Sequence, residues 1–138
     1  MSRLAFLSPD EADVPPGGLR KLEVRGGIPE GAIAIGPSRG LVLVDGDARP
    51  ERDRLTALGY RVYDLTAGLV TLEVEGEQLM RRLTELDLDA LPAIGSVARG
   101  TTAVIERLGP ATFRLHVPAE LAEYVADVID DQAEGLAR

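Results

Sequence analysis

The sequence predicts an α+β fold with antiparallel-rich sheets, built as two related halves. Two alternating strands carry this prediction, because apolar residues occupy every second position of residues 69–75 and of residues 112–117. A third observation is an internal repeat, in which LEVRG at 22–26 is matched by LEVEG at 72–76. In each half a Gly-Pro hairpin also precedes a helix, so each half is expected to be a ferredoxin-like unit.

The first half is expected to follow an extended lead-in over residues 1–18. The lead-in combines turn formers, prolines and acids and holds no hydrophobic period. Pro50 suits the first turn of a helix, and Gly59 suits the position just after its end. In order, the expected elements of this half are strands 19–24, 32–35 and 41–44, helix 49–58 and strand 60–65.

The second half contains the strongest patterns. Pro118 opens a last helix whose apolar stripe includes Leu121, Val125 and Ile129, with acids on the solvent side. In order, the expected elements are strand 69–75, helix 77–86, a loop over 87–95, strands 97–108 and 112–117, and helix 119–131. Together the halves, 19–65 and 66–138, are expected to form a single domain over residues 19–138.

Composition excludes several classes of protein. The chain has 138 residues, no cysteine and a single histidine, so disulfide scaffolds, thiolate metal sites and histidine-rich metal sites are excluded. Its net charge of −8 repels phosphate backbones and anionic lipids, so neither nucleic acid nor a membrane is an expected partner. No apolar run approaches the roughly 20 residues that span a bilayer, and a cytoplasmic location is the default expectation.

Acidic residues provide the first candidates for chemistry. Asp45 and Asp47 follow an apolar strand, as the magnesium-binding acids of phosphoacceptor receiver domains do, although an acidic loop between hairpin and helix is favoured. Asp87 and Asp89 could act as paired carboxylates, but a solvated loop is the favoured interpretation. Residues 119–138 hold six acids and one base, which is typical of the wet side of a helix, with a partner-docking face as the alternative.

His116 and two threonines complete the candidates. His116 alternates with the inward positions of its strand, so its ring is expected on the outer face or at an interface rather than as a general base. Thr101 and Thr102 would need a neighbouring base to act as nucleophiles, and none is evident. Nucleotide-binding loops and the hydrolase elbow are absent, so no catalytic residue and no metal site is predicted.

A series of short motifs follows residue 62 in a fixed order. These motifs are YDLTAG at 63–68, LEVEG at 72–76, LTELDL at 83–88, Leu91-Pro92, RLGP at 107–110 and FRLHVP at 113–118. Their order resembles the folate-binding domain of the glycine-cleavage T-protein (aminomethyltransferase) superfamily. Within it, the layout is most similar to the gamma subunits of heterotetrameric sarcosine oxidase, which also carry a segment like AIGP at 34–37.

The departures from this superfamily bear on activity. Where T-proteins place an essential aspartate, this chain has Thr101 or Thr102, so the resemblance does not imply aminomethyl transfer. Many gamma subunits have a Cys-Pro after the first helix, whereas this chain has Thr84-Glu85-Leu86 there.

The resemblance implies a non-catalytic accessory subunit that docks on a flavin- and folate-dependent amine-demethylating partner. Its partners would be subunits of an oxidase or dehydrogenase complex, with a homo-oligomer as the other possibility. The alternative is a free-standing module that binds a folate or another small anion through Arg99, Arg107 and Arg114. An independent enzyme is the least favoured class, because no acid, base and nucleophile can be assembled from the residues present.

Overall fold

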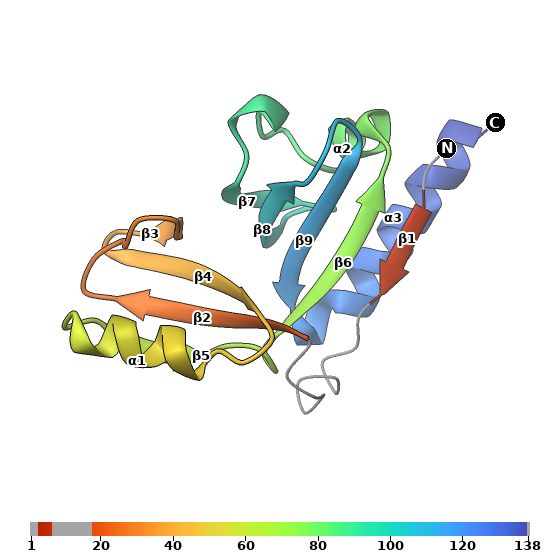
Figure 1. Ribbon diagram of the computed structural model, residues 1–138. Coiled ribbons are helices and arrows are strands. Elements are labelled where there is room, and N and C mark those ends of the chain that lie inside the picture. The colour runs from red at the N-terminus through yellow and green to blue at the C-terminus, as the bar shows by residue number, and fades with distance from the viewer. Residues whose placement is uncertain (1–2, 7–17, 138) are drawn as a thin grey trace. The chain divides into compact units, whose positions relative to one another are not determined.

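A computed structural model describes residues 3–6 and 18–137 (Figure 1). The chain divides into two compact units, each with its own sheet. We call residues 8–69 the N-terminal unit, and residues 1–7 together with 70–138 the C-terminal unit. The predicted boundary between the halves lay at 65/66, four residues before the one that the structure draws.

The C-terminal unit contains a five-stranded sheet. Its strands, in spatial order, are β1 (Arg3–Phe6), β6 (Leu69–Glu75), β9 (Thr112–Pro118), β8 (Thr101–Arg107) and β7 (Ala93–Val97). The pairs β1–β6, β7–β8 and β8–β9 are antiparallel, and β6 and β9 run in opposite directions in Figure 1. Counting β6, β8, β9 and β1 as strands one to four, the order is 4-1-3-2, which is that of a ferredoxin-like unit.

One face of this sheet carries the helices and the core. The helical segments are α2 (Glu77–Leu83), η2 (Leu88–Ala90), η3 (Ala119–Leu121) and α3 (Ala122–Ala137). The core joins the alternate positions of β6 and β9 to α2 and α3, and among its fully buried side chains are Leu72, Met80, Phe113, Leu115 and Ile129. The opposite face of β6 and β9 is polar and includes Thr71, Arg114 and His116.

The N-terminal unit repeats the same strand order with fewer parts. Its four-stranded sheet has the order β3 (Ile33–Gly36), β4 (Arg39–Asp45), β2 (Leu19–Arg25) and β5 (Arg61–Asp64), and α1 spans Arg49–Ala57. In order of sequence this is again 4-1-3-2, but residues 26–32 connect the first two strands without a helix. Leu55 is the buried anchor of α1, and it belongs to a core that also contains Leu22, Val24 and Leu41. Both predicted halves are therefore ferredoxin-like units, and the first lacks the helix between its first two strands.

Several boundaries differ from the sequence prediction. Residues 3–6 of the expected lead-in form β1, whereas residues 1, 2 and 7–17 lie outside the described part. The helix expected over 77–86 ends at Leu83, because Thr84 takes an extended backbone and its hydroxyl donates to the carbonyl of Ser96 at 2.7 Å. The expected continuous strand 97–108 is interrupted by a turn at 98–100, so the supposed loop 87–95 contains the start of β7.

Candidate functional site

The polar face of the C-terminal unit holds a connected row of four side chains. Nδ1 of His116 lies 2.9 Å from the Thr71 hydroxyl, and Nε2 lies 2.7 Å from a carboxylate oxygen of Glu106. The guanidinium of Arg114 donates to the same carboxylate at 3.1 Å. The ladder sets this geometry, because residues 104 and 106 of β8 lie opposite residues 116 and 114 of β9.

The charge on Glu106 determines which ring nitrogen of His116 carries a proton. Burial raises the pKa of Glu106, but hydrogen bonds from His116 and Arg114 outweigh burial and leave the pKa below its ordinary 4.5. The carboxylate is therefore ionised at neutral pH and can only accept, so Nε2 of His116 must carry a proton. In the neutral ring, Nδ1 then accepts from the Thr71 hydroxyl.

The chemistry of this row is limited by its burial. Thr71 and His116 are each 1% exposed, so neither the hydroxyl nor the ring presents a reactive atom to solvent. The sequence prediction placed His116 on the outer face or at an interface, and the ring does lie on the face opposite the core, where it is buried. His116 and Glu106 are thus placed as a base and its orienting acid beside the Thr71 hydroxyl. A nucleophile must also reach its substrate, and the burial of Thr71 and His116 prevents this.

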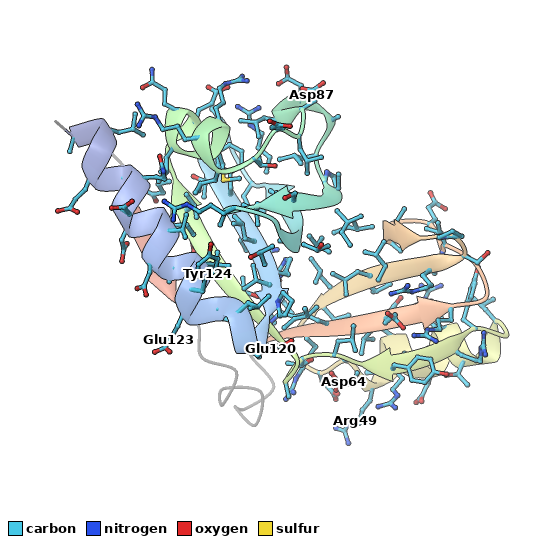
Figure 2. All side chains as sticks on the ribbon, turned by 180° about the vertical axis from the view of Figure 1, so that it is seen from behind. Arg49, Asp64, Asp87, Glu120, Glu123 and Tyr124 are labelled. Atoms are coloured by element: carbon cyan, nitrogen blue, oxygen red, sulfur yellow. The ribbon has the colours of Figure 1, made fainter. Side chains whose placement is uncertain are left out.

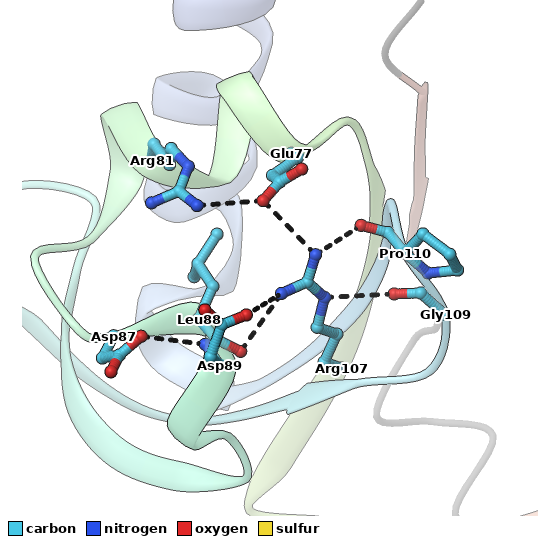
Figure 3. A network of polar contacts seen from close by, with 8 residues as sticks. All are labelled: Glu77, Arg81, Asp87, Leu88, Asp89, Arg107, Gly109 and Pro110. Carbon is cyan, nitrogen blue, oxygen red and sulfur yellow. Dashed lines mark hydrogen bonds and ion pairs between the residues drawn. The ribbon is translucent and has the colours of Figure 1, made fainter.

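Arg107 lies at the end of β8, and its donors are already occupied (Figure 3). The guanidinium donates to the carbonyl of Pro110 at 2.6 Å and to that of Gly109 at 3.3 Å. It also pairs with Asp89 at 3.1 Å and with Glu77 at 3.4 Å. This side chain therefore joins the β8–β9 turn to the start of α2 and to the η2 segment.

The three arginines predicted to bind an anion do not converge. Arg99 lies in the β7–β8 turn and Arg107 at the far end of β8, about 20 Å away at the usual strand rise. Arg114 lies on the face of Glu106, whereas Arg107 stacks over the Phe113 ring on the core side. Arg107 and Arg114 have close carboxylate partners, whereas Arg99 approaches Asp131 only to 3.8 Å, so a ligand shared by all three would have to displace the ion pairs of Arg107 and Arg114.

The predicted acid pairs also have local partners. Asp47 accepts from Arg49 at 2.9 Å, and this hydrogen bond lowers the pKa of Asp47. Asp87 caps the η2 segment by accepting from the backbone of Asp89 at 3.0 Å. Within residues 3–6 and 18–137, no group of three or more acids or histidines is arranged to hold a metal ion. Thr101 is buried, whereas Thr102 is exposed.

A depression in the N-terminal unit lies beside the start of α1. Its volume is about 330 Å³, and its lining mixes Arg20, Arg49 and Arg52 with Asp47 and Asp64. Arg49 and Asp64 are labelled in Figure 2. The lining carries three arginines and two aspartates, and Arg49 is held by Asp47, so this depression does not present a single sign of charge to a ligand.

The outer face of α3 combines acids with exposed apolar side chains (Figure 2). Leu121 and Tyr124, three residues apart, are both exposed. We define the α3 acidic face as these two residues together with the exposed acids Glu120, Glu123, Asp127, Asp130, Asp131 and Glu134. The described last turn of α3 has no basic residue, so the helix dipole is not offset there. Sequence patterning correctly placed the acids on the solvent side, but it assigned Leu121 to the buried apolar stripe, which is wrong because Leu121 is 39% exposed.

Comparison with known proteins identifies the fold. No protein-family model and no curated protein matches the chain. Among solved structures, it is similar to a chain of the heterotetrameric sarcosine oxidase from Corynebacterium sp. U-96, in complex with pyrrole 2-carboxylate. The TM-score is 0.73 at 19% identity, and the match covers 96% of this chain and 84% of that chain. The predicted α+β class with two ferredoxin-like halves is confirmed. In the described residues, no helix has the length and apolar character needed to cross a membrane.

Proposed function

We propose that this chain is a non-catalytic accessory subunit of a flavin-dependent amine-demethylating oxidase, comparable to the gamma subunit of sarcosine oxidase. The observation that carries the proposal is the match to a chain of a heterotetrameric oxidase over 96% of one chain and 84% of the other. Coverage this high on both sides means that the two chains are alike in extent, so the likeness is not to one domain of a large subunit.

The chemistry of the described residues supports a non-catalytic role. The one histidine is buried and already bonded to Thr71 and Glu106. Arg107, the best-placed candidate for a ligand, is engaged by backbone carbonyls and two acids. A subunit of this kind would contribute a surface to its complex, while the partner would supply flavin and folate.

The α3 acidic face is the surface that we assign to the partner. Like charges four residues apart, such as Glu123 with Asp127 and Asp127 with Asp131, repel one another and destabilise an isolated helix. A partner surface rich in arginine and lysine would relieve this repulsion and speed association. Leu121 and Tyr124 supply the apolar centre that interface hot spots require, because an exposed aromatic ring buries much area at low entropic cost.

Affinity purification of the tagged chain from its native host, followed by mass spectrometry, tests the proposal. We expect subunits of a flavoprotein oxidase or dehydrogenase in stoichiometric amounts. Recovery of this chain alone would contradict the accessory role. Its measured mass would then distinguish a homo-oligomer from a monomer, and titration with folates would test the ligand-binding alternative.

A pair of matched variants tests the assigned surface once a partner is purified. Tyr124→Ser is expected to weaken the complex by about 30-fold, the effect of losing a hot spot of about 2 kcal/mol. Tyr63→Ser is the control, because Tyr63 on β5 is 44% exposed, as Tyr124 is. Equal affinities for the two variants would remove α3 as the contact surface and leave the subunit proposal to the purification experiment.

A further inference from the structure

The C-terminal unit contains a concave surface beside the end of α2. Its lining comes from the end of α2, the following segment and the β7–β8 turn, and its volume is about 740 Å³. This volume falls within the range of roughly 300–1,000 Å³ that small-molecule sites occupy. Three arginines, Arg81, Arg82 and Arg99, line it, and Glu85 is its one acid. We call it the arginine depression.

The arginines differ in how far they are committed to other partners. Arg81 donates to Glu77 at 2.9 Å and is engaged (Figure 3). Arg99 approaches Asp131 only to 3.8 Å, and both side chains are more than half exposed, so water screens this pair. Within the described part of the chain, the side chain of Arg82 makes no ion pair or hydrogen bond. Two guanidinium groups are therefore available to a ligand.

The turn that carries Arg99 has an unusual backbone. Ala98 and Arg99 are consecutive non-glycine residues with φ of 49° and 64°, and Gly100 follows with φ of 100°. Side chains with a Cβ rarely adopt this left-handed conformation, and such strain gathers at functional positions. Ala98 is buried in the core, but the Arg99 side chain is exposed, so packing does not require an arginine at this left-handed position, where asparagine or glycine would serve at lower cost.

Two hydrogen bonds fix the turn against the end of α2. The amide of Ala98 donates to the carbonyl of Leu83 at 2.9 Å, and the Thr84 hydroxyl donates to the carbonyl of Ser96 at 2.7 Å. The backbones that carry Arg82 and Arg99 are thus tied together before any ligand arrives. Preorganisation of this kind lowers the entropic cost of binding.

We propose that the arginine depression binds a small molecule bearing a carboxylate or phosphate group, held between Arg82 and Arg99. Planar guanidinium groups match these oxyanions through paired hydrogen bonds. Ser96 and Gly100 line the same surface. This inference does not depend on the subunit proposal, because it concerns a ligand of the chain by itself.

Titration of the full chain with inorganic phosphate and, separately, with malonate tests the proposal by backbone amide NMR at constant ionic strength. We expect saturable shifts at Ser96, Arg99 and Gly100 for at least one anion, with a dissociation constant on the order of 1 mM or lower. Tighter binding of phosphate would indicate a phosphorylated ligand, and tighter binding of malonate a carboxylate. Shifts that rise linearly with both anions would overturn the proposal.

Matched double variants separate a site from general charge attraction. Arg82→Gln/Arg99→Gln should weaken binding at least tenfold. Arg52→Gln/Arg61→Gln removes the same charge from exposed positions in the N-terminal unit and should leave the affinity unchanged. Equal losses in the two double variants would show that net charge alone attracts the anion, which would also overturn the proposal. All four positions are exposed, so folding should be retained in each variant.

Discussion

Replacement of Arg107 by methionine distinguishes a structural role from the ligand-binding role that the sequence predicted. Methionine keeps most of the apolar stem but removes every hydrogen bond shown in Figure 3 that the guanidinium makes. The β8–β9 turn would lose its tie to α2 and to the η2 segment. The variant should therefore be less stable than the parent chain.

The expected loss follows from the individual contacts. The bonds to the carbonyls of Pro110 and Gly109, at 2.6 Å and 3.3 Å, contribute about 0.5–1.5 kcal/mol each. The pairs with Asp89 and Glu77 lie at the surface and add about 0–1 kcal/mol together. We therefore expect the free energy of unfolding to fall by about 2 kcal/mol.

Urea unfolding followed by far-ultraviolet circular dichroism measures this change. With a urea dependence of about 2 kcal/mol per molar, the midpoint should fall by about 1 M. Arg107→Lys should lose about half as much, because an ammonium cannot match the planar fork. Arg61→Met is the control, as Arg61 is exposed on β5, and surface changes of this kind stay within about 0.5 kcal/mol.

The result that refutes this reasoning is a midpoint for Arg107→Met within the range of the control. Arg107 would then contribute nothing to stability, and the anion-binding interpretation would become the better account of its position. The same curves test the prediction that residues 19–138 form a single domain. We propose one cooperative transition, and two resolved transitions would show that the units unfold separately.

Three further predictions concern stability. The folded pKa of Glu106 lies below 4.5, so the ionised carboxylate stabilises the folded chain above that pH, and this stabilisation is lost as the pH falls through the folded pKa. Glu106→Gln should therefore make the urea midpoint fall less steeply below pH 4.5 than it does in the parent chain. Gly95→Ala should destabilise the chain by about 1–3 kcal/mol, because a Cβ there would lie 2.6 Å from Leu86; a parental melting temperature would contradict this overpacking. Gly135→Ala in α3 should stabilise it by about 0.5–1 kcal/mol, since its Cβ would meet Arg82 at an ordinary 3.5 Å, and a lower melting temperature would reject this.

Part of the candidate chemistry could be predicted from the sequence. Alternation in residues 112–117 correctly put His116 on the face opposite Phe113 and Leu115. It could not show that Thr71 and Glu106 flank the ring, because these residues lie on other strands. The period of a strand assigns a face to each side chain, whereas cross-strand register decides its neighbours.

The arginines show the same limit for charged residues. Local spacing correctly placed Arg107 at a turn but could not reveal that the turn's own carbonyls occupy its guanidinium. Arg82, which carries no motif, became a candidate only when the β7–β8 turn was seen beside α2. The sequence held only a weak indication of the arginine depression, namely the presence of arginines at 81, 82 and 99 in an acidic chain.

The sequence by itself determined the α+β class, the repeated halves, and the elements whose hydrophobic period is complete within a few residues, such as β6, β9 and α3. Tertiary structure alone decided that Arg3–Phe6 supplies the fourth strand of the C-terminal sheet, with Arg3 opposite Glu75. It also decided which polar groups are buried and paired. The physical reason is that a hydrophobic period arises from neighbours along the chain, whereas ladder hydrogen bonds and ion pairs join residues far apart in sequence and leave no local pattern.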